Sequence, residues 1–241
     1  MDLVYEESQW RDTSNKDVRY VGIPNMNSPG KYLAQSLSVN HLQTITSIEQ
    51  KNNQWTLHTQ ESGEIHHKFD WLILAIPAPQ VINLCNSNLQ DIIEIAKKAK
   101  MKACFTLMST FNQSTNVEFD AAFVNNEIIS WICKNNSKPG RHGLESWTIH
   151  TNPEWSEQFA DLDLNSAQDL IIACAQKIGL DPQNAQNSIH RWRYANGFID
   201  SIPEFLINAN QQIGACGDWL HGGRVEGAWL SGHKLANVLN T

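Results

Sequence analysis

The stretch Cys216-Gly-Asp-Trp-Leu-His-Gly-Gly-Arg-Val-Glu-Gly-Ala-Trp-Leu-Ser-Gly-His-Lys-Leu-Ala-Asn-Val-Leu239 decides the fold of this chain. The residues before it, from Gln211 to Cys216, are suited to a buried strand, and Gly217-Asp218 follows directly. Beyond the glycine-rich turn, apolar residues recur at helical spacing from Ala228 to Leu239. The sequence therefore predicts a strand, a turn and then a helix that opens between Arg224 and Gly227.

Two features of this stretch suit a ligand. Gly217 has no side chain, so another molecule can approach its backbone closely, and the Asp218 carboxylate can accept hydrogen bonds from hydroxyl groups. The start of the helix offers free N–H groups and a partial positive charge, which favour an anionic group. The alternative is an ordinary surface helix after a strand, in which the glycines serve only the turn.

The pattern Gly-Asp, then Gly-Arg-Val-Glu-Gly-Ala-x-x-Ser-Gly, resembles the C-terminal flavin-binding segment of the FAD-dependent amine oxidase superfamily. The resemblance implies that Asp218 contacts the ribityl chain of FAD. It also implies that the backbone from Val225 to Ala228 faces the N1/C2 carbonyl edge of the flavin. The cofactor-binding residues expected in this segment are Gly217, Asp218, Arg224, Val225, Glu226, Gly227 and Ala228.

A second part of the chain resembles the same superfamily. His41–Ile48 and Gln54–Thr59 alternate in polarity and predict a hairpin, and the continuously apolar run Phe69–Ile76 predicts a strand buried on both faces. Thr44-Ile-Thr-Ser-Ile48 and Asp70-Trp-Leu-Ile-Leu-Ala-Ile-Pro77 match segments that follow the cofactor-binding strand and helix in that superfamily. By this resemblance Ile45 meets the adenine through its backbone and Ala75 lies near the dinucleotide.

Three further elements are predicted to be helical. A helix begins at Ser28-Pro29 with Tyr32, Leu33 and Leu37 on its inner face, and a second helical pattern runs from Gln80 to Lys100. The third begins at a capping box, Ser166-Ala-Gln-Asp169, and closes at Gly179. Around it, five segments predict strands of one mixed or antiparallel sheet: 103–111, 121–124, 128–133, 145–150 and 189–194.

These elements predict an α+β or α/β chain in which a sheet-based substrate domain is inserted into an incomplete, Rossmann-like FAD-binding domain. Residues 20–79 and 210–241 are assigned to the FAD-binding domain, and residues 1–19 and 80–209 to the substrate domain. The domain is called incomplete because superfamily members begin with a strand, Gly-x-Gly-x-x-Gly and a helix, and this sequence has no such motif. We therefore expect the nucleotide-binding segment to be missing from the N-terminal side.

Within the middle region the sequence closely resembles bacterial members of the renalase family. The matching segments are Arg19-Tyr-Val-Gly-Ile-Pro24, Trp131-Ile-Cys-Lys-Asn-Asn-Ser-Lys-Pro-Gly-Arg141, His150-Thr-Asn-Pro-Glu-Trp-Ser156 and His190-Arg-Trp-Arg-Tyr-Ala195. Renalases are flavoproteins that oxidise misreduced dihydronicotinamide dinucleotides and pass the electrons to oxygen. The resemblance implies that the catalytic face is lined by Asn135, Trp192, Arg193 and Tyr194. Alternatively, the arginines form surface ion pairs and Asn135 caps a turn.

Composition excludes several other classes of function. The formal net charge of −7 argues against nucleic acid as a partner, because binding phosphates requires clustered lysine and arginine. No apolar run approaches the roughly 20 residues of a membrane span, and the histidines and five scattered cysteines lack metal-ligand spacing. We expect a cytoplasmic protein that binds FAD and a small-molecule substrate, with no metal, nucleic acid or membrane.

The sequence thus predicts an FAD-dependent oxidoreductase of renalase type that acts on dihydro-NAD(P) isomers with oxygen as the electron acceptor. Two alternatives stay open. One is a flavin amine oxidase or desaturase, because the flavin motifs are shared across the superfamily. The other is a non-catalytic, truncated remnant.

Overall fold

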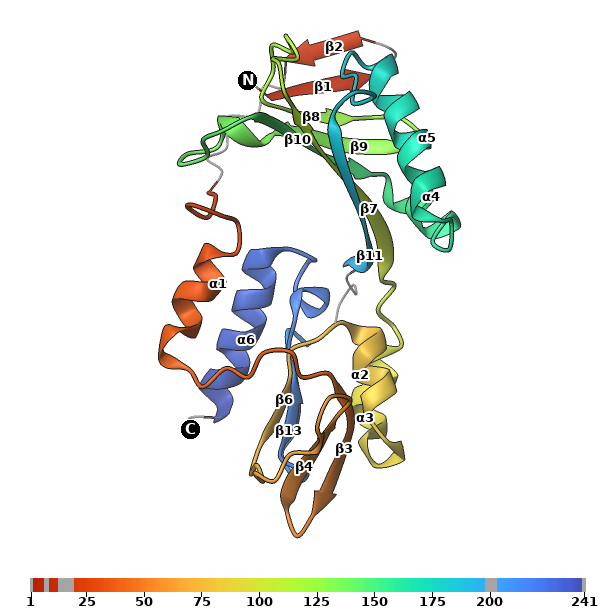
Figure 1. Ribbon diagram of the computed structural model, residues 1–241. Coiled ribbons are helices and arrows are strands. Elements are labelled where there is room, and N and C mark those ends of the chain that lie inside the picture. Colours follow the sequence, from red (N-terminus) through yellow and green to blue (C-terminus); the bar gives the residue numbers. More distant parts are fainter. Residues whose placement is uncertain (1, 7–8, 13–19, 198–202, 240–241) are drawn as a thin grey trace. The chain divides into compact units, whose positions relative to one another are not determined.

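The computed structural model describes residues 2–6, 9–12, 20–197 and 203–239 (Figure 1). The chain forms two compact units. Unit 1 consists of residues 1–38 and 102–193, and unit 2 of residues 39–101 and 194–241. Arg19, where the renalase resemblance begins, and most of the segment 1–19 lie outside the described residues.

The bounds of these units differ from the predicted domains. Residues 20–38 group with unit 1, whereas residues 80–101 and 194–209 group with unit 2. The sequence did not predict these bounds because the chain passes between the units near Ser38, Met101 and Arg193. None of these points has the glycine- or proline-rich composition that marks a linker. Which unit holds the cofactor and which the substrate stays a prediction.

Unit 1 is built on a seven-stranded sheet with the order β11-β7-β10-β9-β8-β1-β2. The pairs among β7, β10, β9 and β8 are antiparallel, and β1 runs parallel to β8, so the predicted mixed sheet is confirmed. Its strands are β1 (Asp2–Glu6), β2 (Gln9–Asp12), β7 (Lys102–Phe111), β8 (Ala121–Val124), β9 (Ile129–Lys134), β10 (Glu145–Thr151) and β11 (Gln186–Asn196).

Helices cover one face of this sheet, as Figure 1 shows for α4 (Pro153–Gln158) and α5 (Leu164–Lys177). Since side chains alternate along a strand, every second residue joins the core under these helices. Phe105, Leu107, Trp147 and Ile149 are all buried there. The predicted capping box was misplaced: α5 begins earlier, because the carboxylate of Asp163 accepts the backbone N–H of Ser166 at 3.0 Å.

Helix α1 (Ser28–Leu33) begins at the predicted residues and continues into a 3₁₀ turn, η1 (Ala34–Ser36). The prediction of a buried inner face was wrong. Tyr32, Leu33 and Leu37 are exposed at 71%, 57% and 65%, and α1 contains no buried residue. With only six residues, the helix is too short to display a clear apolar stripe.

Unit 2 contains two small sheets. The predicted hairpin forms the first, with β3 (Ile45–Lys51), β4 (Gln54–Thr59) and β5 (Gly63–Glu64) in antiparallel order. The second has the order β12-β13-β6, and its strands are β12 (Leu206–Asn208), β13 (Ile213–Ala215) and β6 (Leu72–Leu74). Within this second sheet β13 runs antiparallel to β12 and parallel to β6.

Two predictions in unit 2 need correction. The run 69–76 is not a strand buried on both faces: only Leu72–Leu74 is extended in the sheet, and Ile73 is 39% exposed because β6 lies at the edge of the described strands. The pattern 80–100 is two helices rather than one, α2 (Ala78–Leu84) and α3 (Gln90–Ala96), separated by the 3₁₀ turn η2 (Ser87–Leu89). Helix α2 ends at Leu84, because the backbone of the next residue, Cys85, is extended.

Two fully buried tryptophans fix the ends of β13. The indole N–H of Trp55 donates to the carbonyls of Gln211 and Gln212, both at 3.1 Å, just before the strand. The indole N–H of Trp219, in the 3₁₀ turn η4 (Asp218–Leu220) after the strand, donates to Ile76 O at 3.1 Å. These bonds place β13 against both the hairpin and the chain that follows β6. The last helix, α6 (Val225–Leu239), begins where the sequence predicted. No helix of the described residues is long and apolar enough to cross a membrane.

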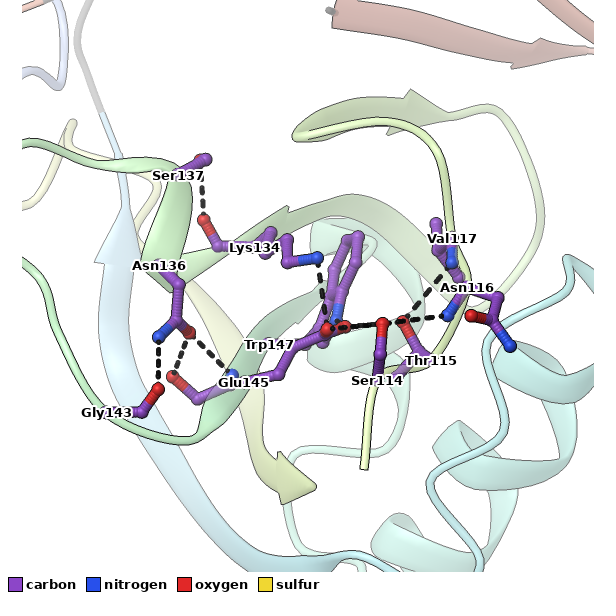
Figure 2. A network of polar contacts seen from close by, with 11 residues as sticks. Ser114, Thr115, Asn116, Val117, Lys134, Asn136, Ser137, Gly143, Glu145 and Trp147 are labelled. Atoms are coloured by element: carbon purple, nitrogen blue, oxygen red, sulfur yellow. Dashed lines mark hydrogen bonds and ion pairs between the residues drawn. The ribbon is translucent and has the colours of Figure 1, made fainter. Parts of the chain in front are cut away.

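A polar network around Glu145 holds the core of unit 1 to its neighbouring loop (Figure 2). The carboxylate of Glu145 accepts the hydroxyl of Thr115 at 2.5 Å and the indole N–H of Trp147 at 2.8 Å, and it lies 3.0 Å from Lys134 Nζ. Burial by itself would raise the pKa of Glu145, but these hydrogen bonds and the lysine outweigh it and hold the pKa at about 2.

Replacement of Glu145 by glutamine should lower the free energy of unfolding at neutral pH by about 1.5 to 3 kcal/mol, because charge-assisted hydrogen bonds are lost. A pKa lowered in the folded state stabilises the protein above the ordinary glutamate pKa. This contribution disappears as the pH falls toward the folded value of about 2. Denaturant unfolding at several pH values should therefore show the two proteins converging in acid. Glu127→Gln, at an exposed glutamate of the same unit, is the control and should change little.

Candidate functional site

The candidate site of unit 2 lies where β6 and β13 end. The two strands run parallel with Leu74 opposite Ala215, and the N–H of Cys216 donates to Leu74 O at 3.1 Å. Ala75 and Gly217 therefore leave the sheet at the same edge. In α/β proteins ligands bind beyond the carboxyl ends of parallel strands, and two segments that the sequence assigned separately to a cofactor meet at that edge.

Asp218 begins the turn beyond this edge. Its backbone carbonyl accepts the N–H groups of His221 at 2.9 Å and Gly223 at 2.8 Å, which fixes the turn. Its carboxylate is half-buried and makes no side-chain hydrogen bond among the described residues. Burial raises the pKa of this carboxyl, and backbone contacts at Trp219 and Asp218 itself oppose the rise only in part. A ligand that donates hydrogen bonds from its hydroxyl groups would stabilise such a half-buried carboxylate.

The sheet edge and α6 are joined through Ser231. The N–H of Gly217 donates to Ser231 Oγ at 3.1 Å, and this hydroxyl in turn donates to Glu204 O at 2.5 Å. Ser231 is fully buried. The sequence predicted this helix, but no local pattern assigned the Ser231 hydroxyl a partner 14 residues away.

The first turn of α6 packs directly on the turn that follows Asp218. A Cβ built on Gly227 would lie 1.9 Å from His221 O, so only glycine fits there. The N–H of Ala228 already donates to Arg224 O at 3.0 Å. The free donors at this helix start are therefore the N–H groups of Val225 to Gly227. The side chains of Arg224, Val225 and Glu226 are exposed.

A hollow of about 580 Å³ lies beside the same strands. Ile45 and Ala75, the two residues predicted to lie near the adenine and the dinucleotide, both line it. Apolar residues of both sheets form most of its wall, among them Ile48, Leu57, Leu72, Ile73, Leu74 and Ile76. Ile45 begins β3 and Ala75 follows β6, so the fold brings together residues from two different sheets' strands and their ends.

In unit 1 the predicted catalytic residues fall on two different faces of the sheet. Arg191 lies over the ring of Phe105, 5.8 Å away, on the face that the helices cover. Arg193, two residues further along β11, shares that face and lies 3.3 Å from the exposed carboxylate of Asp161. By the same alternation Trp192 lies on the opposite face. The structure thus separates Arg193 from Trp192, and the position of Arg193 is that of a surface ion pair.

The face opposite the helices, which we call the open face, carries aromatic side chains. Trp192 is 54% exposed, with its ring 4.2 Å from that of His190. On β9 and β10, Trp131 and His150 are directly opposite each other, with ring centroids 5.2 Å apart. The sequence did not select this second pair, although both residues lie in the segments that resemble renalases. Only the register of two antiparallel strands makes them neighbours.

Asn135 and Tyr194 are the remaining predicted residues. Asn135 opens the 3₁₀ turn η3 (Asn135–Ser137) directly after β9, and its side-chain oxygen accepts hydrogen bonds from Lys138 and Arg141. Tyr194 lies on β11 and is 37% exposed, and it groups with unit 2 rather than unit 1. The structure therefore brings no two of the four predicted catalytic residues into contact through their side chains among the described interactions.

No protein-family model matches the chain. Solved structures with a similar fold include a protein assigned as a protoporphyrinogen oxidase from Exiguobacterium sp. 255-15, with 16% identity and a TM-score of 0.66. The match covers 89% of this chain and 51% of that one. Putrescine oxidase bound to putrescine matches with 11% identity and a TM-score of 0.64, covering 89% and 52% of the two chains. Cyclohexylamine oxidase from Brevibacterium oxydans matches with 12% identity and a TM-score of 0.60, covering 80% and 47%.

These similarities define the fold. The chain shares the mixed α+β fold of these three oxidases, and it spans about half the length of the solved structures it matches. The predicted fold class is confirmed. Identities of 10 to 16% say nothing more specific about chemistry, so function must be argued from the site residues.

Two alanine substitutions in α6 test how closely this helix must approach the turn. Gly227→Ala should lower the free energy of unfolding by about 1 to 3 kcal/mol, because its Cβ would overlap a backbone carbonyl. Gly232→Ala is the matched control on the same helix. The nearest atom to its Cβ is Cys216 Sγ at 3.9 Å, so the better helix propensity of alanine should stabilise the protein by about 0.5 to 1 kcal/mol. Denaturant unfolding followed by tryptophan fluorescence measures both, and equal effects would contradict the packing described.

Proposed function

We propose that this chain is part of an FAD-dependent oxidoreductase in which unit 2 contributes to the flavin site. The observation that carries the proposal is the meeting of Ala75 and Gly217-Asp218 at the carboxyl ends of two parallel strands. Asp218 presents a half-buried carboxylate without a side-chain partner among the described residues, which suits the hydroxyl groups of a ribityl chain. The likeness to oxidases of the same fold supports the assignment.

The other predicted contacts to FAD fit this arrangement in part. Ile45 would meet the adenine through its backbone, Ala75 would lie near the dinucleotide, and the N–H groups of Val225 to Gly227 would face the flavin edge. Arg224 and Glu226 would contribute only through their backbone, and Ala228, whose N–H already donates to Arg224 O, only through packing. The sequence contains no Gly-x-Gly-x-x-Gly motif, so we assign the diphosphate contacts to a separate nucleotide-binding segment. FAD, when bound, accepts a hydride from the substrate.

For the substrate, we propose a dihydronicotinamide dinucleotide of the kind that renalases oxidise, with oxygen as the final electron acceptor. The open face of unit 1 suits a planar ring, because it carries Trp131, His150 and Trp192 on one side of the sheet. Asn135 and Tyr194 would orient the ring. Hydride transfer depends on such positioning more than on acid or base groups. Arg193 would act only by holding β11 through its contact with Asp161.

A second candidate is an amine oxidase or desaturase. It is favoured by the similarity of the fold to those of putrescine oxidase and cyclohexylamine oxidase. A third, a non-catalytic remnant, would retain the fold without turnover. The first two candidate functions differ in the charge of the substrate. The third candidate, a remnant, would catalyse no reaction.

Asp218→Ala should weaken FAD binding by about 1 to 3 kcal/mol, through loss of a charge-assisted hydrogen bond. Titration with FAD of the chain joined to its nucleotide-binding segment, followed by the change in flavin fluorescence, measures the dissociation constant. Asp70→Ala is the matched control. It removes an exposed carboxylate just before β6, at the opposite end of the strand, where it accepts a hydrogen bond from Gln54. Equal weakening by both variants would show that Asp218 has no specific contact.

In the flavin-loaded protein, 2-dihydro- or 6-dihydro-NAD(P) should bleach the flavin absorbance in a single fast anaerobic phase, and monoamines should not. Trp192→Ala should slow this phase by about tenfold or more without releasing FAD, because a misplaced ring loses its alignment for hydride transfer. Tyr32→Ala, at an exposed aromatic residue of α1, is the control and should react normally. Bleaching by amines alone would favour the second candidate, and bleaching by neither class the third.

A further inference from the structure

The turn after β9 carries a pair of positive side chains that the proposed function does not use. Lys138 Nζ donates to Asn135 Oδ1 at 3.2 Å, and Arg141 Nη1 donates to the same oxygen at 3.0 Å. Because both donors share one acceptor, the two cations are close neighbours. Like charges at such a separation repel each other, and a neutral amide oxygen does not neutralise them.

No carboxylate contacts either cation among the described residues. The second guanidinium nitrogen of Arg141 donates to Gly22 O at 2.9 Å, and its Nε is buried without a hydrogen-bond partner. In a chain with a formal net charge of −7, a pair of partly buried cations without an acidic partner is unusual. Buried polar atoms are nearly always hydrogen-bonded, so Arg141 Nε lacks the acceptor that such an atom normally has.

The turn that carries the pair is held in place by its own contacts. Asn136 accepts the N–H of Ser146 at 2.8 Å and donates to Gly143 O at 3.2 Å, and Ser137 donates to Lys134 O at 2.8 Å (Figure 2). The N–H of Arg141 donates to Lys138 O at 3.3 Å. The side chains therefore start from a fixed backbone, which reduces the entropy lost when they bind a ligand.

The pair lies close to the aromatic side chains of the open face. Burial, and after it the charge of Lys138, lowers the pKa of His150, and Lys138 also opposes the rise that burial causes in the pKa of the Cys133 thiol on β9. His150 is therefore neutral at pH 7, and its ring packs on Trp131. An apolar aromatic surface and a pair of cations thus adjoin on one side of unit 1.

We propose that Lys138 and Arg141 form a subsite for the phosphate group of a substrate whose planar ring packs on the aromatic residues of the open face. The diphosphate of a dinucleotide carries two negative charges, and the phosphate monoester of the corresponding mononucleotide carries nearly two at pH 7. Either group matches two cations better than a single carboxylate does. The guanidinium fork binds two oxygens at once, and the lysine supplies a point charge. This inference rests on the proposed function and narrows it, because a protonated amine would be repelled here.

The test compares two ligands that differ only in the phosphate: reduced nicotinamide mononucleotide and reduced nicotinamide riboside. Calorimetric titration of the full chain without flavin should give a dissociation constant about tenfold lower for the mononucleotide. Lys138→Met and Asn135→Asp should each reduce this preference to less than about twofold. The first removes a charge, and the second places a carboxylate between the two cations. Lys177→Met, at an exposed lysine in the last turn of α5, should leave the preference unchanged.

Equal affinity for the two ligands, absence of binding by the mononucleotide, or an unchanged preference in Lys138→Met would overturn the subsite. Arg141→Met is a weaker test because it also breaks the contact to Gly22, so its thermal unfolding must be measured alongside. The titration contains no flavin. Its failure is therefore distinct from a failure of the FAD proposal, and it can succeed even if the chain never binds FAD.

Discussion

The parallel pairing of β6 with β13 is the interaction on which the candidate cofactor site depends. In the sequence β6 ends at Leu74 and β13 begins only at Ile213, and a single bond, from Cys216 N–H to Leu74 O, fixes where both leave the sheet. Trp55 and Trp219 hold β13 at its two ends through buried indole hydrogen bonds. If these tryptophans lost their partners, Ala75 and Asp218 would no longer meet, because the three-residue strands have few ladder bonds of their own.

Close packing against α6 adds a second constraint at the same edge. Gly227 allows the helix to touch the carbonyl of His221, and Ser231 links the Gly217 N–H to the chain at Glu204. These contacts leave the Asp218 carboxylate as the polar group that is half-buried and lacks a side-chain partner in the described part of the turn. A site of this kind is prepared for a ligand, since the turn is already fixed before the ligand arrives.

The two faces of the sheet of unit 1 carry different side chains. The face under α4 and α5 is an apolar core, with Glu145 satisfied by a network of donors at its margin. The open face carries aromatic rings, and the turn after β9 beside it carries a pair of cations without an acidic partner among the described contacts. Strand alternation makes this division, so adjacent residues such as Trp192 and Arg193 fall into different environments.

The sequence alone determined the hairpin, all five predicted strands of the large sheet and the start of the last helix, because each depends on local periodicity and turn residues. It also selected Asp218 and Ala75 from their motifs. Tertiary structure alone decided that these two residues meet, that Ile73 and the α1 residues are exposed, that Arg193 faces the helices, and that Lys138 and Arg141 share one oxygen. Strand register and long-range packing set these contacts, and neither leaves a pattern in neighbouring residues.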